Sequence, residues 1–420
     1  MATAARLAIV GGTVLRGGEH GFGPGDGQAL NVLIEGERIV GLSAEPPPTD
    51  AQVLDAAGAF VLPGLIDLHT HVPSPLAMLL YVRQGITSVR FAGTPLGAVP
   101  GIRRAIESGE VPGPRLFSCG PLLDEPPAAW GPSSVEVAEP AEARAAAVRL
   151  IDAEADALIV AQRIRPATLR AITEAAHERG VPVTGQTWTT SVRDALKAGM
   201  DGVENTARLP EDPSLPPDWV EGYTSVGHRL ARLAWLWCRA PQGPLDEVVA
   251  LMAERGIDWA PELCSFANWA GHTDAALASL PGYALLREEQ RAALRPSRER
   301  QAGGWTDEDR ENTRRALARM GEAVAAFRRQ GGALAVGTDT HPGGLFYHLE
   351  LGFLARAGLT PAEVLTAATW GGVRALRRTA DLGAVEPGKL ADLIVVEGDP
   401  RADLGALQHV RHTLVGGRLM

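Results

Sequence analysis

Two histidines one residue apart, His69 and His71, close the apolar segment LPGLIDLHTHV at positions 62–72. Side chains two positions apart in a strand point to the same face, so both imidazoles can reach one metal ion. A carboxylate, Asp339, closes the last strand-like segment of the pattern, ALAVGTDTH, at positions 333–341. Two histidines and one carboxylate, with open positions for water, are a ligand set that suits zinc or another first-row metal.

The elements that must bring these residues together occupy the middle of the chain. Between positions 62 and 375, strand-like segments alternate with helical patterns, as where PATLRAITEAAHERG precedes VPVTGQT. This alternation matches a parallel (β/α)8 barrel, in which the first and last strands are neighbours and the active site lies at the carboxyl ends of the strands. The barrel therefore predicts that Asp339 lies beside the histidine pair. A doubly wound open sheet is the alternative, but no G-x-G-x-x-G follows the first strand.

Both ends of the chain differ from the middle. Residues 1–61 and 376–420 read as short strands in which polar and apolar residues alternate between glycine-containing turns. They predict one small β-sheet domain assembled from both termini, beside the barrel at 62–375. A chain of 420 residues is long enough for this arrangement.

The amino-acid composition of the chain restricts the classes of molecule that it can bind. Net charge is −10, and only two lysines, Lys197 and Lys389, stand among 40 basic residues, which argues against nucleic acid and an anionic membrane as partners. The apolar run near position 10 is too short for a transmembrane span, and three scattered cysteines form no disulfide or zinc pattern. We expect a cytoplasmic protein that acts on a small molecule.

Two long segments, 206–250 and 262–312, interrupt the barrel pattern and are rich in tryptophan. Long loops on the active face of a barrel often shape the pocket, so these segments predict a roomy site for a bulky, apolar substrate. The alternative is that the tryptophans form a small core of the insertions themselves. The five residues concerned are Trp219, Trp235, Trp237, Trp269 and Trp305.

Four further residues are expected near the substrate because of their places beside the barrel strands. Trp188 is expected to form a wall of the pocket. Arg90 and Glu262 are expected to contact charge on the substrate or to form structural ion pairs. His341 is a candidate for a further ligand, a proton shuttle or a loop residue.

Several motifs resemble those of the amidohydrolase superfamily, above all its imidazolonepropionase- and prolidase-like members. The motifs are LPGLIDLHTH, GPRLFSCGP, AHERGVPV, AGMDGVEN, AVGTDTH and DLGAVEPGKLADLIVVEGDP, and they run nearly from end to end of the chain. The resemblance implies a distorted (β/α)8 barrel with a β-sandwich built from both termini, and often a homodimer. It also implies one metal on His69, His71 and Asp339, and a second metal on a carboxylated lysine of strand four and on histidines of strands five and six.

The sequence departs from that pattern at the second metal. Ile159 stands at the lysine position, and Gln186 and Asn205 stand at the two histidine positions. Neither lysine of the chain lies near strand four, so no bridging carbamate is available and no second metal is expected. Gln186 could serve as a weak fourth ligand of the first metal. His228 and His272, in the two long segments, could also reach back to the site.

Three functions remain open at this point. One metal on His69, His71 and Asp339 would support hydrolysis of an amide, cyclic amide or ester, with Asp339 as general base and then acid and with Gln186 and Asn205 as donors to the oxyanion. Without a metal, the same residues would support acid–base chemistry, such as cyclisation, dehydration, isomerisation or ring opening, on a bulky natural-product-like substrate. The third is a non-catalytic protein.

Overall fold

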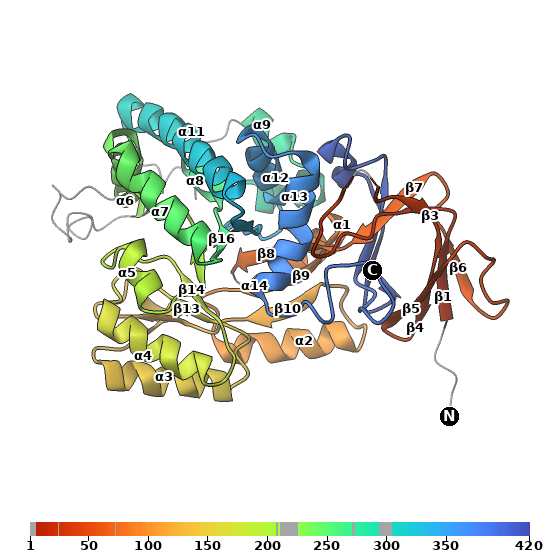
Figure 1. The fold of residues 1–420 in the computed structure, drawn as a ribbon, viewed down its shortest axis with the longest axis horizontal. Helices are drawn as coiled ribbons and strands as arrows, with labels where there is room; N and C mark the ends of the chain where they lie inside the picture. The colour runs from red at the N-terminus through yellow and green to blue at the C-terminus, as the bar shows by residue number, and fades with distance from the viewer. Residues whose placement is uncertain are drawn as a thin grey trace.

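The computed structural model describes residues 6–23, 25–71, 73–206, 209–210, 226–270, 274–292, 294 and 305–420. Figure 1 shows two parts: a large part in which helices surround short strands, and a smaller all-β part that contains the first strands of the chain and the C-terminus. No helix within the described ranges combines the length and the apolar character that a membrane crossing requires.

The smaller part consists of two sheets that share a buried core. One has the strand order β5-β4-β1-β6 and the other β20-β19-β18-β7-β2-β3. Antiparallel pairing of β7 with β18, in which Val61 faces Val395, joins the two ends of the chain, as the alternating patterns predict. The strands are β1 (Arg6–Val10), β2 (Thr13–Val14), β3 (Gln28–Ala29), β4 (Asn31–Glu35), β5 (Arg38–Ser43), β6 (Gln52–Asp55), β7 (Ala59–Pro63), β18 (Leu393–Glu397), β19 (Val410–Val415) and β20 (Arg418–Leu419).

The larger part is built on parallel strands arranged in two sheets, β10-β9-β8 and β12-β11-β13-β14-β15-β16-β17. No continuous ladder joins these sheets, but backbone bonds do, among them those from Leu68 N to Val336 O at 2.9 Å, from Asp339 N to His69 O at 2.8 Å and from Asp156 N to Ser118 O at 2.8 Å. The first and last strands of the barrel are thus neighbours, as predicted. The strands are β8 (Leu65–Thr70), β9 (Ile86–Phe91), β10 (Arg115–Ser118), β11 (Leu122–Asp124), β12 (Ser134–Glu136), β13 (Leu158–Val160), β14 (Val183–Gly185), β15 (Gly202–Glu204), β16 (Asp258–Ala260) and β17 (Ala333–Leu334).

Helices cover the outside of the barrel, and several begin where the sequence provides a cap. Thr306 and Asp309 form a capping box at the start of α11, and Thr360 and Glu363 form one at the start of α13. The helices are α1 (Pro75–Arg83), α2 (Val99–Glu107), α3 (Pro140–Asp152), α4 (Pro166–His177), α5 (Val192–Lys197), α6 (Val226–Arg239), α7 (Gln242–Glu254), α8 (Leu263–Ala270), α9 (Asp274–Ala278), α11 (Asp307–Arg329), α12 (Tyr347–Arg356), α13 (Pro361–Thr366) and α14 (Gly372–Ala375).

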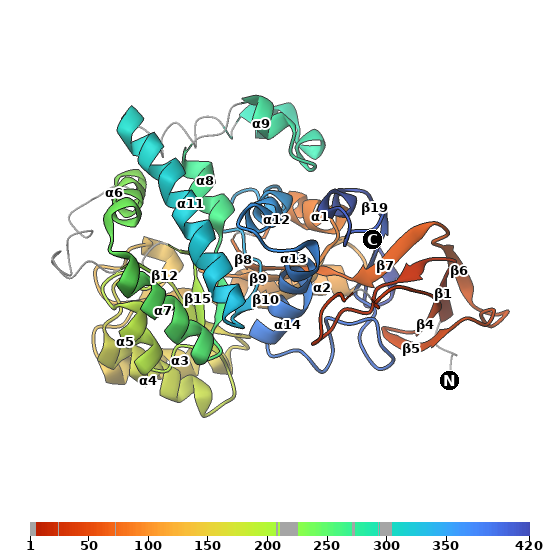
Figure 2. The same ribbon diagram turned by 45° about the horizontal axis from the view of Figure 1, so that its top comes forward.

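The two segments predicted to be long loops are partly helical. They contain α6 to α9, and Figure 2 shows α11 running alongside α6 and α8. Trp237 is fully buried and donates from Nε1 to Thr206 O at 3.2 Å, and Trp305 is 8% exposed in the same core. These two tryptophans therefore pack in the main core together with residues of the barrel strands, and not in a separate small core of the insertions. The interpretations of Trp219, Trp269, His228 and His272 concern residues or side chains outside the described part.

Candidate active site

The candidate site lies at the carboxyl ends of the barrel strands, where three chain reversals aim polar side chains inward. Asn205, Glu262 and Asp339 follow β15, β16 and β17, and each has a positive φ angle, of 65°, 53° and 45°. Residues other than glycine seldom adopt this left-handed conformation, and such conformations are concentrated at functional sites. Three of them at neighbouring strand ends mark this rim of the barrel.

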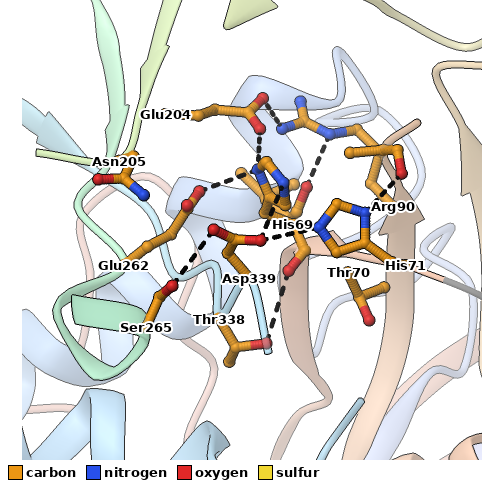
Figure 3. Close-up of polar contacts among 12 residues, drawn as sticks. His69, Thr70, His71, Arg90, Glu204, Asn205, Glu262, Ser265, Thr338 and Asp339 are labelled. Carbon is orange, nitrogen blue, oxygen red and sulfur yellow. Dashed lines mark hydrogen bonds and ion pairs between the residues drawn. The ribbon is translucent and has the colours of Figure 1, made fainter. Parts of the chain in front are cut away.

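His71 and Asp339 meet at the mouth of the barrel. His71 Nε2 lies 2.8 Å from Asp339 Oδ1, and Ser265 donates its hydroxyl to Asp339 Oδ2 at 3.2 Å (Figure 3). Both side chains are 24% exposed, so solvent and a small molecule can reach them. The structure thus brings His71 and Asp339 together across the closure between β8 and the last strand segment, as the barrel predicts.

The second nitrogen of His71 determines where its proton lies. His71 Nδ1 is 2.8 Å from the carbonyl oxygen of Ala92, which can only accept, so Nδ1 carries the hydrogen. Nε2 of a neutral imidazole then presents a lone pair to the Asp339 carboxylate. Two acceptors at 2.8 Å repel each other unless a cation, either a proton or a metal ion, lies between them.

The ring of His69 is oriented in the same way, with Nδ1 toward oxygen acceptors and Nε2 toward Asp339, but this side chain is buried. Its side chain is 1% exposed, and Nδ1 faces Glu204 Oε2 and, at 3.1 Å, Glu262 Oε1, while Nε2 lies 3.7 Å from Asp339 Oδ1 (Figure 3). Nδ1 therefore lies against two carboxylates, and Nε2 is directed toward Asp339. Histidines that bind metals commonly donate their other ring nitrogen to a carboxylate or carbonyl in this way. The Nε2 atoms of both histidines and a carboxylate oxygen of Asp339 converge, so the residues present fit one divalent metal.

Arg90 fixes the carboxylate that holds His69. Arg90 and Glu204 are each 2% exposed; a terminal guanidinium nitrogen of Arg90 pairs with Glu204 Oε1, and its Nε donates to Leu68 O at 2.8 Å. Burial alone would raise the pKa of Glu204, but Arg90 and His69 outweigh burial and lower it to about 2. Glu204 is therefore a permanent anion between one fixed cation and the imidazole.

The remaining carboxylates of the cluster respond differently to burial. Burial raises the pKa of Glu262 to about 8, against the attraction of His69. Burial acts in the same direction on Asp339, but His69 and His71 outweigh it and lower the pKa of Asp339 to about 2. At neutral pH, Asp339 is thus ionised and can accept a proton. For His69, the charges of Glu262, Glu204 and Asp339 outweigh burial, and the pKa of the imidazole is raised well above its usual value.

Asp67, two residues before His69 on β8, has a structural position. It is fully buried and accepts from Thr338 N at 3.1 Å and from Thr338 Oγ1 at 2.8 Å. These bonds tie β8 to the segment that carries Asp339. Burial raises the pKa of Asp67 to about 7.

The other predicted residues lie around this centre at different depths. Gln186, Trp188 and Asn205 line a cavity of about 10 Å³ behind Glu204, which has room for about one water molecule. Asn205 Oδ1 accepts from the backbone of the next residue at 2.8 Å. The ring of His341 is 5.3 Å from that of His71, at the mouth of the barrel. Ile159, the residue expected to stand at the lysine position of strand four, is 1% exposed within β13.

Sequence reasoning missed Glu204 and Ser265. Glu204 directly precedes Asn205 in AGMDGVEN, and the signal in the sequence is an ionisable residue that ends a buried parallel strand. Arg90 and Glu262, expected to contact substrate charge or to form ion pairs, both face the buried Glu204–His69 pair. Arg90 forms an ion pair with Glu204, whereas Glu262 lies against the ring of His69.

Comparison with known proteins identifies the family. Residues 60–420 match the family model described as the amidohydrolase family. The chain belongs to the amidohydrolase family. It is 26% identical to an uncharacterised protein of Mycobacterium tuberculosis over 419 residues, which cover 95% of this chain and 94% of the relative. It is also 27% identical to the imidazolonepropionase of Pseudomonas paraeruginosa over 388 residues, covering 87% and 86% of the two chains.

The fold of this family member has counterparts among solved structures. A protein described as a putative prolidase from Bifidobacterium longum superposes with a TM-score of 0.73 at 24% identity, covering 100% of this chain and 95% of the other. At this identity the likeness concerns the fold alone. It agrees with the predicted barrel and its accompanying β-sandwich.

Proposed function

We propose that this amidohydrolase-family protein is a hydrolase that uses one divalent metal, held by His69, His71 and Asp339, to cleave an amide, a cyclic amide or an ester. The observation that carries the proposal is the orientation of both imidazoles. Each directs Nδ1 toward oxygen acceptors of the protein and leaves Nε2 facing Asp339. This arrangement suits a cation better than it suits two neutral imidazoles and an anion alone.

The proposal is limited to one metal. The family resemblance implies a bridging lysine at strand four for a second metal, and Ile159, which is buried, stands at that position. A catalytic zinc needs only three protein ligands and an open position for water. The partial exposure of His71 and Asp339 is consistent with such an open position on the solvent side.

Each residue has a defined part in the proposed reaction. His69, His71 and Asp339 would hold the divalent metal, which would lower the pKa of water and polarise the substrate carbonyl. Asp339, ionised and held at Oδ2 by Ser265, accepts the proton of the attacking water and delivers it to the leaving group. Glu204 and Glu262 hold the ring of His69 in its orientation. Gln186 and Asn205 as oxyanion donors, and His341 as a proton shuttle, remain predictions.

One observation favours a second function. The side chains of Arg90, Glu204, His69 and Asp339 form a chain of alternating charge when His69 is protonated. In that state His69 is an acid and Asp339 a base without any metal, which would suit ring opening or isomerisation of a small molecule. Hydrolysis of an unactivated amide would be slow in this state, since no Lewis acid polarises the carbonyl.

Hydrolysis assays separate the two functions. The purified chain would be tested on amides, lactams and esters before and after exhaustive chelation, and again after zinc, manganese or cobalt is restored. A metal-dependent hydrolase loses turnover on chelation and regains it with one added equivalent of metal. Turnover that survives chelation and still requires His69 and Asp339 would favour the acid–base enzyme. A protein that binds the compounds without converting them would be non-catalytic.

A further inference from the structure

A second cavity lies at the opposite end of the barrel, where the strands begin. It has a volume of about 300 Å³, and it is lined by residues of both the barrel and the terminal sheets. Arg115 starts β10 and Asp156 precedes β13, whereas Glu37 and Arg418 belong to the terminal sheets. This volume is at the lower end of the range of small-molecule sites, which are frequent at domain boundaries. None of the residues assigned to the active site takes part.

The floor of this interdomain cavity is apolar. Phe117, Leu116 and Leu382 are 5%, 5% and 3% exposed and line it together with Ile106. The guanidinium of Arg378 lies 5.8 Å from the centroid of the Phe117 ring. An apolar body of a ligand could therefore pack against an aromatic ring and aliphatic side chains.

One side of the cavity carries excess positive charge. Arg103 and Arg378 share a single carboxylate, that of Asp156, at 3.4 Å and 3.2 Å. Asp156 also accepts from the backbone of Ser118 at 2.9 Å. Two guanidiniums on one carboxylate leave one net positive charge, and each guanidinium has five N–H donors to offer an anion.

Negative charge on another part of the wall comes from Glu37. Among the described residues, Glu37 has no ion-pair partner within 4.0 Å. Arg115, which also lines the cavity, donates instead to both carboxylate oxygens of Asp392, at 2.9 Å and 3.1 Å. Arg418, also in the wall, donates to the carbonyl oxygen of Glu107 at 2.6 Å. The lining contains equal numbers of basic and acidic side chains: Arg103, Arg115, Arg378 and Arg418, and Glu37, Glu107, Asp156 and Asp381.

We propose that the interdomain cavity binds a small zwitterion with an apolar side chain, such as an α-amino acid. The carboxylate of the ligand would be held by Arg103 and Arg378, its ammonium group by Glu37, and its side chain by Phe117 and Leu382. A wall without net charge gives a simple anion or a simple cation no overall attraction. A ligand that carries both charges and an apolar group matches all three features at once. The inference does not depend on the chemistry at the other end of the barrel.

Calorimetric titration with one set of related compounds tests this ligand class. L-Phenylalanine would be compared with 3-phenylpropionate, which lacks the ammonium group, and with phenethylamine, which lacks the carboxylate. We expect phenylalanine to bind, to raise the melting temperature with concentration, and to bind at least about tenfold more tightly than either analogue. Equal affinity for phenylalanine and an analogue would overturn the zwitterion. No binding of phenylalanine, leucine or methionine up to about 10 mM would overturn the site.

Substitutions in the cavity test whether phenylalanine binds there. Arg378→Met and Glu37→Gln should each weaken phenylalanine binding at least about tenfold, because each removes a charged partner from the rim of the cavity. Arg144→Met is the matched control, since Arg144 is an exposed arginine paired with Glu178 outside the cavity. His71→Ala should bind phenylalanine as the parent chain does. Loss of binding in His71→Ala with retention in Arg378→Met would place the ligand at the mouth of the barrel and contradict the proposal.

Discussion

His71 Nε2 and Asp339 Oδ1 lie 2.8 Å apart although 268 positions separate the two residues in sequence. The closure of the barrel creates this contact, since His71 follows the first barrel strand and Asp339 follows the last. With the hydrogen of His71 directed to Ala92 O, the contact needs a cation between the two groups. The proposed one-metal site depends on this relationship.

Asp339→Asn tests the proposed general base. The substitution keeps the shape of the side chain but removes the charge that binds a cation and accepts a proton. We expect turnover of any identified substrate to fall by at least about 100-fold, the lower limit typical of lost acid–base catalysis. Asp201→Asn is the matched control, because Asp201 pairs with His177 at 2.8 Å on a partly exposed surface remote from the barrel mouth. Full activity in Asp339→Asn would refute the assignment.

Glu204→Gln tests the carboxylate that orients His69. A glutamine can still accept a hydrogen bond, but it carries no charge opposite His69 and Arg90. Loss of such an outer partner typically weakens metal binding about 10- to 100-fold, so we expect an increase of that size in the dissociation constant for zinc, measured by competition with a chromogenic chelator. Unchanged zinc affinity would show that Glu204 has no part in positioning His69.

Arg90→Met tests the buried ion pair by a different readout. Removal of Arg90 leaves Glu204 buried without its fixed cation, which costs about 3–5 kcal/mol of unfolding free energy. The exposed pair of Arg144 and Glu178 provides the control, and Arg144→Met should cost less than about 1 kcal/mol. Urea denaturation of the two variants measures both values. Similar small losses in both would contradict a structural role for Arg90.

The stability of the fold should depend on pH through His348. This side chain is buried, its Nε2 finds no hydrogen-bond partner in the described part of the chain, and burial lowers its pKa to about 4. Between the folded pKa of about 4 and the unfolded value of about 6.5, the unfolded chain binds more protons, so stability falls as pH decreases through this window. The contribution from pH 6.5 to pH 5 is about 2 kcal/mol.

Comparison of variants isolates that contribution. His348→Leu should reduce the loss of stability between pH 7 and pH 5 relative to the parent chain. Chemical denaturation at a series of pH values gives the slopes. An identical pH slope in His348→Leu and the parent would contradict a buried neutral imidazole.

Gly343 should be essential to the packing beneath the histidine pair. A Cβ on this residue would collide with the Tyr81 hydroxyl and lie 2.7 Å from Thr70 Oγ1, and these two hydroxyls are hydrogen-bonded to each other. Gly343→Ala should therefore destabilise the fold by about 1–3 kcal/mol, as overpacking of a core usually does. In the Tyr81→Phe background the cost should be smaller, since the obstructing oxygen is gone. Additive effects in this double-mutant cycle would contradict the predicted contact.

Much of the architecture could be predicted because it depends on local patterns. The alternation of strands with helices between 62 and 375 predicts the barrel, and the barrel in turn places Asp339 beside His69 and His71. The two terminal sheets likewise follow from alternating polar and apolar residues. These features need no knowledge of how one side chain meets another.

The inner part of the site could not be predicted in the same way. The direction of Glu204, the backbone reversals at Asn205 and Glu262, and the bond from Ser265 to Asp339 depend on contacts between distant segments. The sequence leaves two interpretations of the tryptophan-rich insertions open for a related reason: Trp237 and Trp305 are apolar aromatic residues, and their sequence positions alone do not distinguish a pocket wall from a core. Packing against α11 and the barrel decides that outcome.

The most direct test of the central claim is elemental analysis by mass spectrometry of the chain purified without added metal or chelator. The one-metal account predicts about one equivalent of zinc, manganese or iron per chain. It also predicts loss of that metal in His71→Ala and its retention in His177→Ala, a matched histidine that pairs with an aspartate elsewhere on the surface. A metal content far below one equivalent would contradict the account if the chain is folded and if added zinc neither binds to it nor raises its stability. That result would favour the acid–base enzyme.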